Sequence, residues 1–383
     1  MSTLKVDAIR HNSATSDAIT TASDGTCTAK LTSVGGAPLS HRNKVINGAM
    51  TVSQRASSKA MGNTENAYVC VDRFKIHNVH DGAVTASQSS TSPDGFGKSL
   101  KFDVTTADTN LTTSQRLHII HYIEAQDLQD LGYGTSGAKE ARVSFYVRSN
   151  KTGNYTFALN QADNGYKNIS IQYTINSANT WERKSFVVPG DTAGVINDDN
   201  GTGIELYWWL AAGPTYTSGS LRSDWTAYSN GDFAAGQGVN LLDSTSNEFY
   251  LTGVQFEVGD TVTTFEHRSF GEELSRCQRY CQVYVNPRLR GVLGSGGAGD
   301  FNRMGMTLLN TLRTDPSATW SGTQSVYGGS GTASITGIAS LYVDPYSFEI
   351  DGTASGTLSG GGGTAVVAYT GGNEATLTLS AEL

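Results

Sequence analysis

The chain has 383 residues and a formal net charge of −8 at pH 7, and only 16% of its residues are charged. Binding to nucleic-acid phosphates needs a basic surface, so this acidic balance argues against nucleic acid as a partner. No run of about 18 apolar residues could form a membrane-spanning helix. The polar N-terminal segment with Lys5 and Arg10 lacks the apolar region of a signal peptide, and we expect synthesis in a reducing cytoplasm.

Composition favours an all-β protein of two or three domains. Glycine occurs 44 times, above its usual frequency of ~7%, which indicates many tight turns between short strands. The four cysteines are too far apart for a disulfide framework, and we expect free thiols. Cys277, Cys281 and His267 lack the close cysteine pairs of zinc sites, so buried thiols on a helix face are the preferred interpretation.

Residues 1–42 are too few and too polar to fold alone. Two short strands are predicted around the Ser-Asp-Gly turn at 23–25, and the Gly- and Pro-containing residues 35–38 form a linker. We interpret this segment as an attachment or trimerisation arm that symmetry mates or another protein would cover. A flexible tail is the alternative.

Residues 43–268 are predicted to form a large jelly-roll β-sandwich. Turn signals separate short segments with almost no helical periodicity, which is typical of a sandwich or jelly roll. In one of them Val143, Phe145 and Val147 share a face. The predicted strands are 68–79, 83–89, 98–104, 114–123, 141–149, 153–160, 168–175, 181–188, 203–211 and 248–258.

A strand and a short helix end this domain. The apolar side chains change parity after Gly253, as one bulged residue in a buried strand would produce. Ser269 and Glu272 then form a capping-box pattern for a connector helix within residues 269–282. Apolar residues at spacings of four, three and four are predicted to form one stripe along it, namely Phe270, Leu274, Cys277 and Cys281.

Residues 283–383 are predicted to form a small C-terminal β-domain, or tip. Glycine-rich runs at 291–299 and 360–363 interrupt it, but strand-like alternation continues to the final TLTLSAEL. Its apolar residues are small and sparse, so we expect the other subunits of a trimer to complete its packing.

An ordered series of motifs over residues 43–281 resembles a module of bacteriophage tail fibres and related virion appendages. The motifs are NKVINGAMTVSQR at 43–55, VDRF at 71–74, ARVSFYVRSN at 141–150, TWERKSFVVP at 180–189, and TGVQFEVG, FEHR, EEL and CQRY between 252 and 280. The resemblance implies a β-sandwich similar to carbohydrate-binding modules, on a trimeric, non-enzymatic virion protein. It is weaker over the C-terminal region.

No motif supplies a catalytic mechanism, and we predict that the protein is not an enzyme. The G-x-S-x-G, P-loop and H-E-x-x-H patterns are absent. His118 and His121 are three residues apart and would face opposite sides of a strand, so they are a poor metal pair. A glycan depolymerase would need two paired carboxylates, and the sequence cannot identify such a pair.

The long polar loop predicted at 213–233 is the main candidate for glycan binding. Aromatic rings stack on sugar faces, and neighbouring polar groups bind the hydroxyls. The glycan-binding candidates are Tyr216, Arg222, Asp224, Trp225 and Tyr228. Alternatively, Trp225 fills the edge of the sandwich and the tyrosines only pack the loop, because large aromatic side chains are usually mostly buried. The aromatic residues of the tip are a second candidate platform, namely Trp320, Tyr327, Tyr342 and Tyr346.

The run Asn-Asp-Asp-Asn-Gly at 197–201 is a calcium candidate through Asp198 and Asp199, because carboxylate and amide oxygens are calcium ligands. The EF-hand spacing is absent, and a tight polar turn without an ion is the alternative that we prefer. We therefore predict no cofactor.

These features predict a homotrimeric virion appendage, a short tail fibre, that adheres to host-surface polysaccharide. The N-terminal arm would bind other tail proteins, and several low-affinity sites on one virion would act together. One alternative is a purely structural virion component, such as a capsid decoration or tail-nozzle protein. The other is a glycan depolymerase.

Overall fold

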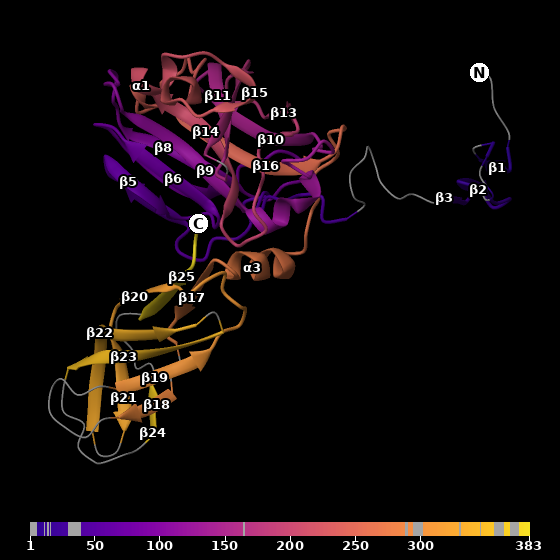
Figure 1. The fold of residues 1–383 in the computed structure, drawn as a ribbon. Helices are drawn as coiled ribbons and strands as arrows, with labels where there is room; N and C mark the ends of the chain where they lie inside the picture. The colour runs from indigo at the N-terminus through magenta and orange to yellow at the C-terminus, as the bar shows by residue number, and fades with distance from the viewer. Residues whose placement is uncertain are drawn as a thin grey trace.

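The protein is all-β, and a jelly-roll β-sandwich forms its body (Figure 1). The computed structural model describes residues 6–10, 12–13, 15, 17–29, 40–163, 165–287, 290–293, 302–328, 331–344, 346–355, 364–367 and 375–383. A narrower β unit lies beside one end of the sandwich, and the helix α3 lies between the two.

Two antiparallel sheets form the sandwich. The six-stranded sheet has the order β13 (Glu182–Val188), β10 (Ala141–Ser149), β16 (Glu248–Val258), β8 (Ser99–Thr106), β7 (Ala83–Ser89) and β4 (Ser58–Met61). The seven-stranded sheet has the order β15 (Arg222–Ala227), β12 (Lys167–Ile175), β11 (Gly153–Gln161), β14 (Thr202–Ala212), β9 (Arg116–Glu124), β6 (Phe74–Val79) and β5 (Thr64–Tyr68). Two 3₁₀ helices, η1 (Ala125–Leu131) and η2 (Leu241–Asp243), lie between strands.

The hydrophobic core lies between the sheets, because alternate residues of each strand point inward. Val143 and Phe145 of β10 are buried there, as the alternation predicts. Trp208 of β14 packs against them from the other sheet, with its ring 5.6 Å from that of Phe145. Its neighbours Tyr207 and Trp209 point to the opposite face and belong to a separate buried cluster.

The predicted bulge in β16 is confirmed. Along the pairing of β10 with β16, Ser144 lies opposite Gln255 but Tyr146 lies opposite Thr252, so β16 carries one extra residue. Gly253 has a φ of 61°, which a glycine adopts without strain. This extra residue restores the inward direction of the apolar side chains on both sides of it.

Two other predictions about the sandwich need correction. The predicted strand 68–79 is interrupted between β5 and β6 by a turn at Arg73, where φ is 70°. Val69 and Val71 in this turn are buried, so the sequence there resembles a continuous strand. The predicted loop 213–233 contains the helices α1 (Pro214–Thr217) and α2 (Asn230–Phe233), and between them the edge strand β15.

The connector helix α3 (Phe270–Gln278) starts where the capping pattern predicts. The Ser269 hydroxyl accepts a hydrogen bond from the Glu272 backbone N–H at 3.2 Å. The predicted apolar stripe is wrong in two places. Phe270 is 61% exposed, and Cys281 begins the strand β17 (Cys281–Val285) rather than continuing the helix.

The narrower unit contains a three-stranded sheet and a closed barrel. The sheet has the order β17, β25 (Thr376–Ser380) and β20 (Ser317–Ser321). The barrel has the order β18 (Arg290–Leu293), β19 (Asn302–Thr307), β23 (Ser347–Ser355), β22 (Gly331–Val343), β21 (Gln324–Gly328) and β24 (Thr364–Val367). Apart from 291–293, the predicted glycine-rich runs lie outside the described residues.

The last residues of the chain attach this unit to the sandwich. The Glu382 carboxylate is buried and pairs with Arg73 and Arg55. The Arg73 guanidinium lies 3.4 Å from the ring centroid of Tyr280, and its side chain is fully buried. Leu383 joins a small apolar cluster with residues of the sandwich and α3. The junction is therefore a packed interface.

The N-terminal segment forms a small sheet of β1 (Ala8–Ile9), β2 (Ile19–Thr21) and β3 (Cys27–Ala29). β2 and β3 pair around the predicted turn at 23–25, whereas the predicted linker 35–38 lies outside the described residues. All four cysteines are free thiols, and Cys27 is the exposed one. The division into domains at 42, 268 and 282 stays a prediction.

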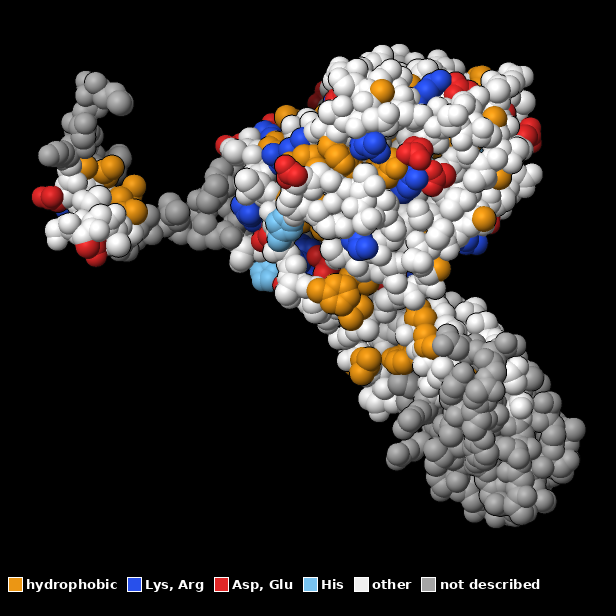
Figure 2. Space-filling view, turned by 180° about the vertical axis from the view of Figure 1, so that it is seen from behind, with side chains coloured by type: hydrophobic (Ala, Val, Ile, Leu, Met, Phe, Trp, Pro, Cys, Tyr) orange, Lys and Arg blue, Asp and Glu red, His pale blue; other side chains and the backbone are white. Residues whose placement is uncertain are grey.

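The surface carries charges of both signs. Figure 2 shows acidic and basic side chains interspersed over the visible face of the sandwich, with hydrophobic side chains near its junction with the narrower unit. No helix of the described residues is long and apolar enough to cross a membrane.

Candidate functional site

The candidate site is a groove on the outer face of the seven-stranded sheet. Alternate residues of β9 and β14 point away from the core there, because side chains of a strand alternate between its faces. Aromatic and polar side chains occupy these outward positions, whereas apolar side chains occupy the inward ones. On the two strands the outward residues are His118, Ile120, Tyr122, Glu205, Tyr207 and Trp209.

The segment 213–233 forms one wall of this groove. The ring of Tyr216 in α1 lies 5.2 Å from that of Trp209, and Phe233 in α2 lies 4.6 Å from Tyr207. An ion pair ties the segment together, since Arg222 Nε and Nη2 donate to Asp232 Oδ2 at 2.9 and 2.8 Å. The wall is thus held by contacts with the outward face of the sheet.

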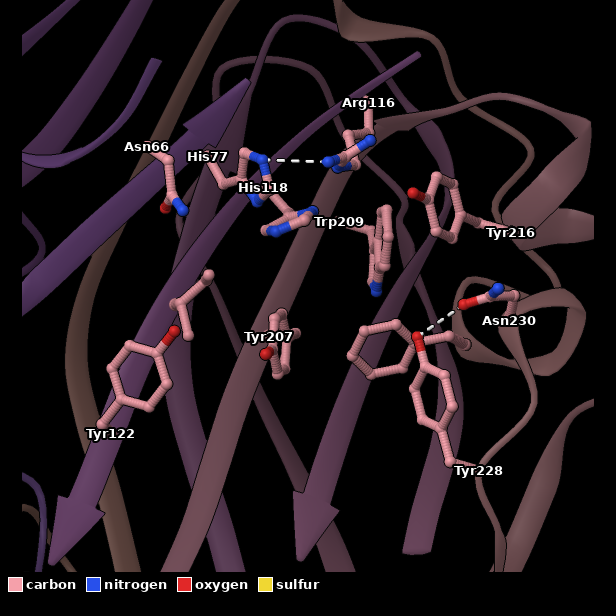
Figure 3. A pocket seen from close by; sticks show the side chains of 12 residues that line it. Asn66, His77, Arg116, His118, Tyr122, Tyr207, Trp209, Tyr216, Tyr228 and Asn230 are labelled. Carbon is pink, nitrogen blue, oxygen red and sulfur yellow. Dashed lines mark hydrogen bonds between the residues drawn. The ribbon is translucent and has the colours of Figure 1, made fainter. Parts of the chain in front are cut away.

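Two adjoining pockets make up what we call the sheet groove. The first has a volume of about 200 Å³. Its lining residues are Asn66, His77, Arg116, His118, Ile120, Tyr122, Tyr207, Trp209, Tyr216, Tyr228, Asn230 and Phe233 (Figure 3). The second has a volume of about 550 Å³ and is lined by Asn160, Gly165, Tyr166, Glu205, Tyr207, Ala227, Tyr228 and Phe233. Three aromatic residues line both pockets.

Arg116 and His77 lie at one end of the first pocket (Figure 3). Arg116 Nη2 lies 3.0 Å from His77 Nε2, and Arg116 Nη1 donates to the Ser114 carbonyl at 2.9 Å. Burial, together with the positive charges of Arg116 and Lys75, lowers the pKa of His77 to about 4. His77 is therefore neutral at pH 7, and its Nε2 accepts the hydrogen bond.

Two buried side chains of the first pocket have polar atoms without a partner. The two ring nitrogens of His118 have no hydrogen-bond partner among the described residues, and the indole N–H of Trp209 has none either. His118 is 3% exposed and Trp209 is fully buried, with ring centroids 4.5 Å apart. An unpaired buried polar group costs free energy, so a ligand or water that reached these atoms would remove that cost.

The second pocket contains a buried carboxylate. Glu205 Oε2 accepts hydrogen bonds from the Tyr207 hydroxyl at 2.6 Å and from Asn160 Nδ2 at 3.0 Å. Burial raises the pKa of Glu205 above its usual value. The carboxylate, in turn, raises the pKa of the exposed Tyr166 at the rim.

The predicted glycan-binding residues lie in different places. Tyr216 and Tyr228 line the sheet groove. Arg222 is engaged with Asp232, and Asp224 is exposed on β15. Trp225 lies outside both pockets. Its indole N–H donates to the Pro189 carbonyl at 2.8 Å, and its ring packs against the core. This position agrees with the alternative interpretation, in which Trp225 fills the edge of the sandwich.

The predicted tip residues are spread over several strands. Trp320 is half-buried in β20, and Tyr346, which is 66% exposed, lies between β22 and β23. The side chains of Tyr327 and Tyr342 are outside the described parts of the chain. Glycan binding by these residues stays a prediction.

At the two possible metal sites, the calcium candidate at Asp198 and Asp199 and the zinc candidate with His267, the side chains make contacts with other parts of the protein. Asp199 Oδ1 accepts a hydrogen bond from the Gly201 N–H at 2.8 Å, which closes a tight turn, and Asp198 is exposed. The His267 ring packs 5.1 Å from Phe96. Within the described ranges, no group of three His, Cys, Asp or Glu side chains could hold a metal ion.

Most residues of the sheet groove were not predicted from the sequence. The signal was present, because alternate residues of RLHIIHYIE and of LYWWL are aromatic or polar. Strand alternation places Tyr207 and Trp209 on one face, opposite Trp208. It could not show that this face lies beside His77, His118 and Tyr122, since that depends on the pairing of β14 with β9 and of β9 with β6.

Comparisons with known proteins give fold neighbours. No family model matches the chain, and no curated protein matches it. Among solved structures, the enzymatically active domain of bacteriophage CBA120 tailspike protein 4 aligns with a TM-score of 0.29 and 10% identity, over 56% of this chain and 21% of that one.

Two carbohydrate-binding modules are matched over almost their whole length. The family 11 module of the Clostridium thermocellum cellulase Lic26A-Cel5E has a TM-score of 0.28 and 12% identity, over 55% of this chain and 98% of that one. The TmCBM61 module in complex with β-1,4-galactotriose has a TM-score of 0.26 and 11% identity, over 57% and 99%. Because these scores are low, we base the function on the residues of this chain.

Proposed function

We propose that the chain is a non-catalytic glycan-binding protein of a bacteriophage tail appendage, and that the sheet groove is its binding site. The observation that carries the proposal is the groove itself. It combines exposed tyrosine rings at the rim with buried, unpartnered polar groups at the base. Sugar rings present apolar faces and polar edges, and a site of this composition suits both.

The rim tyrosines are the proposed stacking platforms. Tyr228 is 37% exposed and Tyr166 is 48% exposed, and their rings lie 6.5 Å apart on one side of the groove. The Tyr228 hydroxyl donates to Asn230 Oδ1 at 2.8 Å, which fixes the ring direction. A ring held in place loses little conformational entropy when a sugar binds.

The presence of a single carboxylate among the lining residues of the groove favours binding over hydrolysis. Glycosidases use two carboxyl groups about 5–10 Å apart. Among the residues that line the two pockets, Glu205 is the one carboxylate, and it is engaged by Tyr207 and Asn160. Adhesion therefore needs fewer assumptions than depolymerisation.

The virion setting is supported by the motif series over residues 43–281 that resembles phage tail fibres. We propose a homotrimer that is attached through the N-terminal segment 1–42. Three grooves per fibre and several fibres per virion would raise the avidity of individually weak sites. A purely structural capsid or tail-nozzle component is the second candidate, and the unpartnered groups of the groove favour adhesion over it.

The test is binding of the full chain to an array of bacterial surface polysaccharides. We expect Tyr228→Ala to weaken glycan binding about 5- to 150-fold, which corresponds to the ~1–3 kcal/mol that stacking of a nucleic-acid base on one aromatic side chain contributes. Tyr146→Ala, a half-buried tyrosine on the outer face of the other sheet, is the matched control and should bind as the unaltered chain does.

Three outcomes distinguish the candidates. Loss of binding in Trp225→Ala but not in Tyr228→Ala would move the site to β15. Loss only on deletion of residues 282–383 would move it to the tip. A folded protein that binds no glycan would favour the structural role.

A further inference from the structure

We propose that the first pocket of the sheet groove binds a carboxylated sugar, with the carboxylate held by Arg116. This inference rests on the proposed glycan-binding function and adds the class of ligand. The observation behind it is the charge of the pocket. Its twelve lining residues include one arginine and no aspartate or glutamate. A site for neutral sugars would not need an uncompensated guanidinium.

The Arg116 guanidinium has N–H donors beyond those used in its hydrogen bonds. An arginine side chain has five N–H donors. Arg116 uses two of them, one in a hydrogen bond to the Ser114 carbonyl and one in a hydrogen bond to His77 Nε2. Over the described residues, no carboxylate lies within ion-pair distance of it. Planar guanidinium and carboxylate groups form two parallel hydrogen bonds, so an incoming carboxylate is its natural partner.

The guanidinium is also positioned before any ligand arrives. His77 holds it from one side, and the Tyr216 ring lies 5.4 Å from its central carbon on the other (Figure 3). Because the low pKa of His77 keeps this ring neutral, it can accept the hydrogen bond and adds no competing charge. A positioned donor binds more tightly than a mobile one.

The charges near the groove differ between its Arg116 end and its Glu205 end. Lys75 lies on the same sheet face, with its Nζ 5.3 Å from the centre of the Tyr122 ring, and its positive charge acts on Glu205, whose pKa it lowers against the effect of burial. The Glu205 carboxylate lies in the second pocket. An acidic sugar is therefore favoured at the Arg116 end, where no carboxylate lines the pocket, over the Glu205 end, where the charges of Glu205 and Lys75 offset each other.

A carboxylate fits this pocket better than a phosphate monoester, which carries nearly two negative charges. The lining contains a single cation, which balances one negative charge, and the remaining polar groups are neutral imidazole, indole, amide and phenol groups. The His118 nitrogens and the Trp209 N–H border the pocket without a protein partner, so a small movement that exposed them would let them bind hydroxyls of the sugar.

The experiment measures binding of the full chain to uronic-acid polymers (polygalacturonate, alginate and hyaluronan). Each polymer is paired with a derivative whose carboxyl groups are reduced to alcohols, and dextran sulfate is the sulfated comparison. We expect at least one uronic-acid polymer to bind, and both carboxyl reduction and Arg116→Gln to weaken that binding about 10- to 100-fold, as loss of a charged hydrogen-bond pair does.

Arg148→Gln is the matched control. Arg148 also lies over a tyrosine ring, 4.9 Å from the centroid of Tyr250, but on the other sheet. It should retain binding, while an equal loss in both variants would show non-specific attraction and overturn the proposal. Arg116→Lys keeps the charge without the planar fork and should recover only part of the affinity, which also excludes a folding defect.

The remaining outcomes distinguish the proposed carboxylate specificity from the proposed glycan binding. Equal binding of a uronic-acid polymer and its reduced form, or binding of neutral glycans alone, would overturn the carboxylate and leave the glycan function standing. Equal binding of dextran sulfate would show that the pocket binds anions in general rather than carboxylates. A folded chain that binds none of these polymers and no polysaccharide on the array would overturn both.

Discussion

The two histidines of β9 show how position in a strand decides the environment of a residue. As predicted, His118 and His121 face opposite sides. His118 lies beneath the sheet groove against Trp209, and His121 lies inside the sandwich, 4.9 Å from Phe74. Both rings are almost fully buried, and burial lowers both pKa values well below the usual value. Nearby positive charges, Arg116 and Arg73, act in the same direction.

These histidines predict acid sensitivity. The unfolded chain binds protons at both sites near pH 6.5 while the folded chain does not, so stability is fully present above this pH and falls as the pH decreases below it. Between pH 7 and pH 5 we expect a loss of up to about 2 kcal/mol of unfolding free energy for each histidine. Urea titrations across this range would measure it.

The control for this prediction is an exposed histidine. His118→Gln should flatten the dependence of unfolding free energy on pH, whereas His267→Gln, at an exposed position, should leave it unchanged. Identical slopes in all three proteins would show that His118 is not the source.

At the scale of elements, the bulge in β16 connects backbone geometry to packing. A side-chain carbon at Gly253 would lie 2.8 Å from both Phe96 Cζ and Tyr146 Cδ2. The glycine thus provides both the left-handed backbone and the space for two rings on the outer face of the six-stranded sheet. The segment 213–233 shows a second element effect, because α1, β15 and α2 turn a predicted loop into the wall of a groove.

Gly253→Ala is therefore expected to destabilise the sandwich by about 1–3 kcal/mol, through backbone strain and overpacking. The matched control is Gly271→Ala in α3, where a side-chain carbon would meet nothing within 4 Å. That change should be neutral or stabilise the protein by about 0.5–1 kcal/mol, because alanine favours helix. Thermal unfolding of both variants tests the pair, and the same sign in both would contradict the packing argument.

At the scale of the whole molecule, one carboxylate secures the junction between the sandwich and the narrower unit. Glu382 follows β25 of the narrower unit, and its partners Arg55 and Arg73 belong to the sandwich. Arg313 adds hydrogen bonds to the backbone carbonyls of Ala381 and Glu382. A buried arginine left without its carboxylate is costly, so the junction depends on this residue.

We expect Glu382→Ala to destabilise the protein by about 3–5 kcal/mol. Faster hydrogen exchange in β17 and β25 and a broader range of orientations in small-angle scattering should accompany it. Glu272→Ala is the control, since Glu272 forms an exposed pair with Arg276 one helical turn away and should cost about 0.3–0.5 kcal/mol. A rigid junction in Glu382→Ala would show that apolar packing alone holds the two parts together.

Local patterns were enough to predict much of the fold. Strand alternation, turn signals and the capping pair at Ser269 and Glu272 depend on residues close together in the sequence, and the structure contains the corresponding elements. The errors occurred where burial hid a turn, at Arg73, and where a helix ended before its apolar spacing did, at Cys281. In both places contacts from distant parts of the chain decided the backbone.

The sequence by itself determined that this is an all-β sandwich with tyrosine- and tryptophan-rich strands and an acidic overall charge. Only the tertiary structure decided which of those rings meet. The sheet groove combines β5, β6, β9, β11 and β14 with the segment 213–233, and strand order across a sheet is fixed by long-range pairing rather than by any local pattern. For the same reason, Trp225 and Tyr228, three residues apart in the sequence, point to the sandwich edge and to the groove respectively.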